Sequence, residues 1–371
     1  MGMKKSKNEL VIKSMDFALN ILKKDDSFNA LVSPVSVFMA LGMLTNGAAG
    51  DTREELLKAV SMDMDEFNNA MTELIRSTSK DDEQLKLANG IWVNGADKLI
   101  KEYKKKMKEE YRAKLCAENF SVETANEINK FVSKNTKGMI NRLVDMLPPA
   151  SSMILVNALS FCGKWDKPFK EFQVNTEGVF TNVFGKKKRV TMLNGTAGRY
   201  FEVKGGKGFL YPYENEKYIF AALLPDRGMS VDDVLKASEA TEITDALRNA
   251  IHTHVDIGIP EYTLDFETEL SGIMKGFGVN NAFLSGKADF SEMLKGNGED
   301  FISQIIHKTH IELDREGTRA AAITGVMVLG AAPPIPGRNK EVILDRPFIY
   351  FILDNADKIP VFAGRVDDIG N

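Results

Sequence analysis

The sequence contains few of the residues that usually carry covalent or metal chemistry. Among its 371 residues there are only two cysteines and four histidines. Cys116 and Cys162 are far apart in the sequence and lack metal-ligand spacing. We therefore expect two free thiols in a reducing compartment, with a single disulfide as the alternative.

Long apolar runs are also missing. No run approaches the roughly 20 residues that a membrane-spanning helix needs. The N-terminal segment is basic but has no apolar signal-peptide core. We expect a cytoplasmic protein, with export that needs no signal peptide as the alternative.

Neither sign of charge is in large excess, since the net charge is −4 and the pI is about 5.8. The sequence therefore predicts neither a nucleic-acid nor a membrane partner. It has no Gly-x-Ser-x-Gly motif and no Cys–His nucleophile signature, so we expect no enzyme activity. The Gly205–Gly208 turn is too short for a phosphate loop, and no cofactor is expected.

Three further patterns have an ordinary structural interpretation. His252 with His254, and His307 with His310, suggest metal ligands, but we expect no metal site. The run Lys186–Arg189 is interpreted as a solvated hairpin turn, with nuclear targeting or polyanion binding as the alternatives. The lysines in 101–108 are interleaved with glutamates, which favours a solvated helix face over a polyanion site.

Apolar periodicity predicts an α+β domain with mostly antiparallel or mixed sheets. Helices dominate the first half and strands the second. Helices are expected over 8–24, from Ser33-Pro34 to Gly47, within 51–80 and 98–146, near 230–250 and over 267–277. Strands are expected over 85–93, 153–161, 189–193, 209–213, 219–224, 255–259, 302–313, 342–344, 348–353 and 361–366.

The segment 314–341 lies between two predicted strands and is too long for an ordinary connection. From Thr318 to Val328, alternate residues are small or β-branched and would share one face of a strand. Such a segment in the place of a loop indicates function. A flexible surface loop without a role is the alternative.

Short motifs along nearly the whole chain resemble those of the serpin family of serine protease inhibitors, in the same order and spacing. They include Ser33-Pro-Val-Ser36, Asn129-Lys-Phe-Val132, Asn157-Ala158 followed by Trp165, His307-Lys308, Glu316-Gly-Thr318 and Arg346-Pro-Phe348. The resemblance implies one domain over 1–371, with about three β-sheets, eight to nine helices and an exposed reactive-centre loop at about 315–341.

The resemblance also implies a mechanism. A serine protease attacks the loop and forms an acyl-enzyme, after which the loop inserts into the main sheet and traps the protease. The partner is then the target protease in a covalent complex, and the protein is expected to be a monomer. The alternative is a non-inhibitory carrier, chaperone or storage protein of the same fold, which proteases cleave as a plain substrate.

Family spacing places the attacked residue fourteen positions after the hinge glycine, Gly317. The scissile bond is then Ala331–Ala332, which suggests an elastase-like target. Leu329 or Met327 would instead indicate a chymotrypsin- or cathepsin G-like target, and Arg338 a trypsin-like one. The resemblance assigns the hinge to Arg315, Glu316, Gly317, Thr318, Arg319, Ala320, Ala321 and Ala322.

Two further groups of residues follow from the resemblance. Ser33, Ser36, Asn157 and His307 match a polar cluster, called the shutter in this family, that latches the central strands. Trp165 matches the tryptophan beneath the point where insertion begins, called the breach. At the breach, the family's charges are reversed at Glu261 and Arg315, for which we predict an ion pair.

Overall fold

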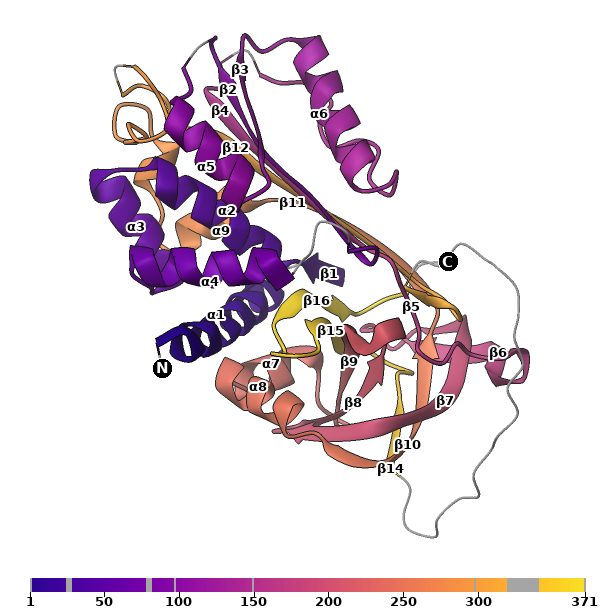
Figure 1. The fold of residues 1–371 in the computed structure, drawn as a ribbon. Coiled ribbons are helices and arrows are strands. Elements are labelled where there is room, and N and C mark those ends of the chain that lie inside the picture. Colours follow the sequence, from indigo (N-terminus) through magenta and orange to yellow (C-terminus); the bar gives the residue numbers. More distant parts are fainter. Residues whose placement is uncertain are drawn as a thin grey trace. The chain divides into compact units, whose positions relative to one another are not determined.

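The computed structural model describes residues 2–24, 29–77, 82–96, 98–148, 150–296, 298–318 and 340–369 (Figure 1). The chain divides into two compact units, each assembled from three segments. Unit 1 comprises Met1–Ser14, Ser33–Ser160 and Asp265–His310, and unit 2 comprises Met15–Val32, Phe161–Leu264 and Ile311–Asn371. The single domain over 1–371 stays a prediction.

Unit 1 contains most of the helices. They are α2 (Pro34–Gly47), α3 (Gly50–Val60), α4 (Met64–Ser77), α5 (Lys101–Glu110), α6 (Val122–Asn135), α9 (Leu270–Gly276) and the first part of α1 (Gly2–Lys24), together with the 3-10 turn η3 (Asn281–Phe283). Every residue of α2 is buried, and its N-cap Ser33 accepts a hydrogen bond from the Ser36 amide at 3.2 Å. The predicted start at Ser33-Pro34 is therefore confirmed.

The strands of unit 1 run in the order β3-β2-β4-β12, and β11 pairs with β12. They are β2 (Leu85–Asn94), β3 (Lys114–Glu118), β4 (Met153–Phe161), β11 (Tyr262–Glu269), which enters the unit at Asp265, and β12 (Ile302–Leu313), which leaves it after His310. All nine residues of β4 are buried, as expected of an inner strand. β4 and β12 are parallel and pair directly, from Ile302 beside Met153 to His310 beside Ser160.

Unit 2 contains a nine-stranded sheet in the order β1-β16-β15-β9-β8-β7-β10-β14, with β6 paired to β7. These strands are β1 (Asn29–Val32), β6 (Val174–Thr181), β7 (Lys187–Val203), β8 (Gly206–Pro212), β9 (Tyr218–Pro225), β10 (Ile251–Pro260), β14 (Lys340–Ile343), β15 (Phe348–Asp354) and β16 (Pro360–Val366). Unit 2 also contains the second part of α1, from Met15 onwards, and four short helices, which are η1 (Glu171–Gln173), η2 (Glu214–Glu216), α7 (Val231–Ala237) and α8 (Ala240–Arg248). It further contains two short strands, β5 (Gly163–Lys164) and β13 (Gly317–Thr318).

The α+β class is confirmed, with nine α-helices among the described residues. The 17-residue β7 pairs with β6, β8 and β10 and joins them into one sheet, so the described strands form fewer separate sheets than the three expected. Besides the two-residue strands β5 and β13, the sequence missed β1, β3, β6 and β11, and the helix expected over 267–277 begins at Leu270 because β11 extends to Glu269. β3 and β6 are short or largely exposed and carry little apolar alternation. No described helix is long and apolar enough to cross a membrane.

Candidate functional site

The root of the long loop is a two-residue strand in unit 2. Thr318 of β13 pairs with Leu313 of β12, and β13 also pairs with β5, antiparallel in both cases. The turn before it is closed by Asp314, whose carboxylate accepts hydrogen bonds from the amides of Glu316 and Gly317 at 2.8 and 3.0 Å. The first residues of the loop therefore already have the pairing of a sheet strand.

Gly317 can be replaced by no other residue without moving the backbone. Its φ is +157°, and a Cβ atom built on it would lie 2.1 Å from the carbonyl oxygen of Gly163. Because that oxygen belongs to the neighbouring strand β5, a side chain here would push the two strands apart. Close backbone approach therefore explains the glycine at this position of the predicted hinge.

Thr318 is fully buried, and its hydroxyl lies 2.7 Å from the hydroxyl of Tyr213. Tyr213 stacks on Trp165, with ring centroids 4.6 Å apart and an interplanar angle of 10°. Trp165 in turn donates from its indole Nε1 to the carbonyl oxygen of Asp314 at 3.0 Å. The loop root thus rests on an aromatic pair that is hydrogen-bonded to it at two points.

The prediction of an ion pair between Glu261 and Arg315 is wrong, because the Arg315 side chain pairs with a different carboxylate. The Arg315 guanidinium pairs with Glu171 at 2.6 Å, on the exposed turn η1. Glu261 instead accepts a hydrogen bond from the Arg315 backbone amide at 3.3 Å. Burial raises the pKa of Glu261, against the lowering effect of the Arg315 amide and charge. Glu261 therefore still holds the loop root, but through the main chain.

Part of the predicted site falls outside the described residues. This applies to the scissile pair Ala331–Ala332 with Leu329, Met327 and Arg338, and to the hinge residues Arg319, Ala320, Ala321 and Ala322. Their assigned roles remain predictions.

The four residues of the predicted shutter lie together in unit 1 and are all fully buried. The carbonyl oxygen of the Asn157 side chain accepts from the Ser36 hydroxyl and from Nδ1 of His307, the latter at 2.8 Å. Its amide nitrogen donates to the Ser36 carbonyl at 2.8 Å and to the Asn89 side chain at 2.9 Å. Asn89 therefore belongs to this polar cluster as a fifth member.

His307 joins α2 to the paired strands β4 and β12. Its Nε2 accepts a hydrogen bond from the Ser33 amide at 3.4 Å, so the proton must be on Nδ1, which donates to Asn157. Burial lowers the pKa of His307 to about 4. The ring is therefore neutral at neutral pH, and both nitrogens are used in the cluster.

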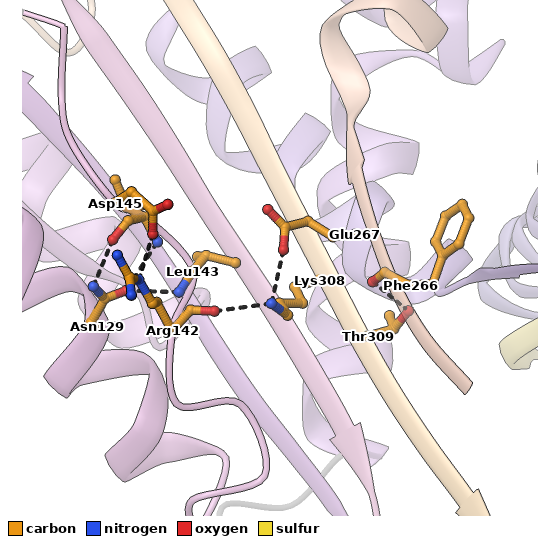
Figure 2. A network of polar contacts seen from close by, with 9 residues as sticks. Asn129, Arg142, Leu143, Asp145, Phe266, Glu267, Lys308 and Thr309 are labelled. Atoms are coloured by element: carbon orange, nitrogen blue, oxygen red, sulfur yellow. Dashed lines mark hydrogen bonds and ion pairs between the residues drawn. The ribbon is translucent and has the colours of Figure 1, made fainter. Parts of the chain in front are cut away.

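The segment after α6 is tied down at two places (Figure 2). The Asn129 side chain on α6 accepts from the amides of Leu143 and Val144 and donates to the Val144 carbonyl at 2.7 Å. Lys308 on β12 donates to the Arg142 carbonyl at 3.0 Å and pairs with Glu267 of β11 at 2.8 Å. Residues 142–144 are thereby fixed both to α6 and to β12.

The histidine pairs do not form a metal site in the part of the chain that the structure describes. No group of three or more potential ligands was found there. His254 instead contacts Asp256 at 3.0 Å on the same strand.

Tyr213, Asn89 and Lys308 have contacts whose importance sequence reasoning missed. Asn89 lies inside β2 and Tyr213 directly follows β8, and their partners are more than 65 residues away in the sequence. Their position in the strands expected over 85–93 and 209–213 was a signal, because a buried hydroxyl or amide needs a partner. The sequence alone did not indicate which residue that partner would be.

Comparison with known proteins agrees with these arrangements. Residues 13–369 match the family model Serpin (serine protease inhibitor). Serpin B9 of Homo sapiens is 28% identical over 94% of this chain and 96% of its own. Native tengpin, a thermophilic serpin, is 31% identical with a TM-score of 0.90, covering 97% of this chain and 94% of its own. Human thyroxine-binding globulin, solved with its ligand, shares the fold with 23% identity and a TM-score of 0.86, covering 99% and 100% of the two chains.

Serpins as a family include many inhibitors of serine proteases and some members that do not inhibit. The match extends over nearly the whole chain, and the loop root and the shutter cluster lie within it. The chain belongs to the serpin family.

Proposed function

We propose that this protein is a suicide-substrate inhibitor of serine proteases. The observation that carries the proposal is the pairing of Gly317–Thr318 with both β12 and β5. In that position, Thr318 is the first residue of a strand that Arg319 and the small residues after it can extend after cleavage. The sequence Ala320-Ala-Ala322 contains no side chain that would resist burial.

Insertion requires β12 to exchange partners. The same strand that meets Thr318 at Leu313 is paired with β4 from Ile302 to His310. About a dozen new hydrogen bonds at roughly 0.5–1.5 kcal/mol each, with buried side chains in addition, would favour the inserted form by on the order of ten kcal/mol. The uncleaved protein is then held in its present form kinetically.

The target is expected to be elastase-like, because the count from Gly317 gives Ala331 as the attacked residue. Leu329, Met327 and Arg338 remain the alternatives. The test is incubation with elastase-, chymotrypsin- and trypsin-like enzymes, followed by denaturing electrophoresis and sequencing of the new N-terminus. A detergent-stable complex with cleavage before Ala332 is expected.

Two results would contradict the proposal or its target. Clean loop cleavage without a complex, and without a rise in melting temperature, would indicate a non-inhibitory member of the fold. A complex formed by cleavage after Arg338 would preserve the mechanism but change the target to a trypsin-like protease.

A further inference from the structure

The hairpin that joins β6 to β7 combines exposed apolar side chains with the basic run Lys186–Arg189. Val179, Val183 and Phe184 have exposed fractions of 46%, 45% and 68%. They are three of the eight large apolar residues that are exposed in the described ranges of the chain. Because exposed apolar side chains that gather on one feature mark an interaction surface, residues 179–189, called the hairpin tip below, are a candidate for one.

Hydrogen bonds fix the main chain of the turn at this tip. The side-chain oxygen of Asn182 accepts from the amides of Phe184 and Lys186, at 3.1 and 2.9 Å. The Val183 amide donates to the Asp367 carbonyl at 3.0 Å. Since these bonds use the amides of the turn, the side chains of Val183 and Phe184 stay exposed to water, which is unfavourable for apolar surface.

The hairpin tip also carries uncompensated positive charge. Lys188 and Arg189 are each paired with an acidic side chain at 2.8 Å. Lys186 and Lys187 are exposed and have no carboxylate partner in the part of the chain that the structure describes. Val179 lies directly opposite Arg189 across the two strands, and both side chains are exposed. Apolar and cationic side chains are therefore neighbours on one exposed hairpin.

We propose that the hairpin tip docks this protein on an anionic lipid surface. Val183 and Phe184 enter the boundary between the lipid headgroups and the acyl chains, where aliphatic and aromatic side chains are favoured. Lys186 and Lys187 lie against the headgroup phosphates, because a negatively charged leaflet attracts clustered lysines. The net charge of −4 gave no indication of this partner, since it averages over the whole chain and the patch is local.

A soluble polyanion fits the hairpin tip less well than a lipid surface. It would contact the lysines but would leave the side chains of Val183 and Phe184 in water. An anionic lipid surface neutralises the lysines and removes the apolar side chains from water in the same contact. The combination of the two kinds of side chain therefore favours the lipid surface.

The test is cosedimentation of the full-length protein with vesicles of phosphatidylcholine alone or of an equal mixture of phosphatidylcholine and phosphatidylserine. The unmodified protein should bind the mixed vesicles at least tenfold more tightly. Lys186→Glu/Lys187→Glu should weaken binding to the mixed vesicles at least tenfold. Lys104→Glu/Lys105→Glu makes the same change of charge at two adjacent exposed lysines of α5 and should change the binding by less than twofold. Melting curves of all variants establish that they are folded.

Substitution of phenylalanine tests the apolar part of the tip. Phe184→Gln should weaken binding to the mixed vesicles several-fold and leave the binding of dextran sulfate, titrated in parallel, unchanged. Phe172→Gln is the matched control, because Phe172 is 83% exposed but lies on η1, next to the opposite end of β6. It should bind the mixed vesicles as the unmodified protein does.

Tryptophan emission reports insertion of the tip directly. Trp92 and Trp165 are both buried, so in Phe184→Trp the added indole is the one that responds to a change of solvent. Its emission should move to shorter wavelength on the mixed vesicles. Three outcomes would overturn the inference. They are no preference of the unmodified protein for the mixed vesicles, equal losses in the two lysine pairs, and no emission shift in Phe184→Trp. Protease inhibition is not read out, so failure here leaves the proposed function untouched.

Discussion

Tyr213 and Thr318 are joined by a hydrogen bond between their hydroxyl groups, 2.7 Å apart, at a position that solvent does not reach. The bond satisfies two hydroxyls that would otherwise be buried without a partner. Burial also raises the pKa of Tyr213, so the phenol stays protonated as a donor. The first strand residue of the loop is thus attached to the aromatic ring that stacks on Trp165.

Replacing Tyr213 with Phe should destabilise the native protein by about 1–3 kcal/mol, because the Thr318 hydroxyl is left buried and unpaired. Urea unfolding followed by tryptophan fluorescence measures the change. Thr318→Val removes the other half of the bond, and the double variant completes a cycle. In the double variant, the second substitution should lower the free energy of unfolding by clearly less than the same substitution does in the unmodified protein. Additive effects would mean that the two hydroxyls do not depend on each other.

A charge at Thr318 tests the proposed insertion directly. Thr318→Glu would bury a carboxylate beside Tyr213, at a cost of several kcal/mol. We expect the loop to be cleaved without formation of a detergent-stable complex, and the number of inhibitor molecules consumed per protease to rise sharply. Thr318→Ser keeps the hydroxyl and should behave like the unmodified protein. If Thr318→Glu forms the complex as well as the unmodified protein does, residue 318 is not the first residue to enter the sheet during insertion.

Much of this architecture was predictable, because local sequence preferences favour the same helices and strands that tertiary packing stabilises. Ser33-Pro34 predicts the start of α2 through capping alone, and the predominantly apolar run after it predicts its burial. The edge strand β3 escaped prediction, since Lys114–Glu118 has charged ends and one fully buried position. Tertiary pairing with β2, which no local pattern encodes, makes it a strand.

The sequence predicted which residues of the site lie near each other, but not which of them form bonds with each other. Sequence placed Glu261 and Arg315 beside each other, and they are neighbours. The guanidinium nevertheless pairs with Glu171, because that carboxylate lies on an exposed turn where charge is cheaply solvated. Which of the two acids pairs with Arg315 depends on how far each carboxylate is buried in the folded protein. A short sequence motif does not contain that information.

Lys308 should slow insertion, because it fixes the segment after α6 to β12 (Figure 2). In Lys308→Met the Arg142 carbonyl loses its donor and Glu267 loses its ion-pair partner, while the apolar part of the side chain remains. We expect spontaneous loss of inhibitory activity on warming to become several-fold faster. The exposed Lys130 on α6 offers a control, and Lys130→Met should leave the half-life unchanged. If inhibitory activity of Lys308→Met has a half-life equal to or longer than that of the unmodified protein, Lys308 does not slow insertion.

The stability of the native protein should fall as the pH is lowered from about 6.5 to about 4. His307 has its pKa lowered to about 4 by burial, whereas a histidine in an unfolded chain titrates near 6.5. Between these values the unfolded chain binds a proton at this ring that the native chain does not. The contribution of neutral His307 is therefore complete above pH 6.5 and is lost towards pH 4, by roughly 3 kcal/mol in all.

Urea unfolding at a series of pH values measures this loss. His307→Gln cannot titrate, so its unfolding midpoint should be lower at neutral pH but should change less across the same window. His254→Gln removes a histidine that is half exposed and lies outside the cluster, and it should retain the full pH dependence. If His307→Gln and the unmodified protein lose stability in parallel between pH 6.5 and 4, the acid sensitivity arises from other groups and not from the ring that joins Ser33 to Asn157.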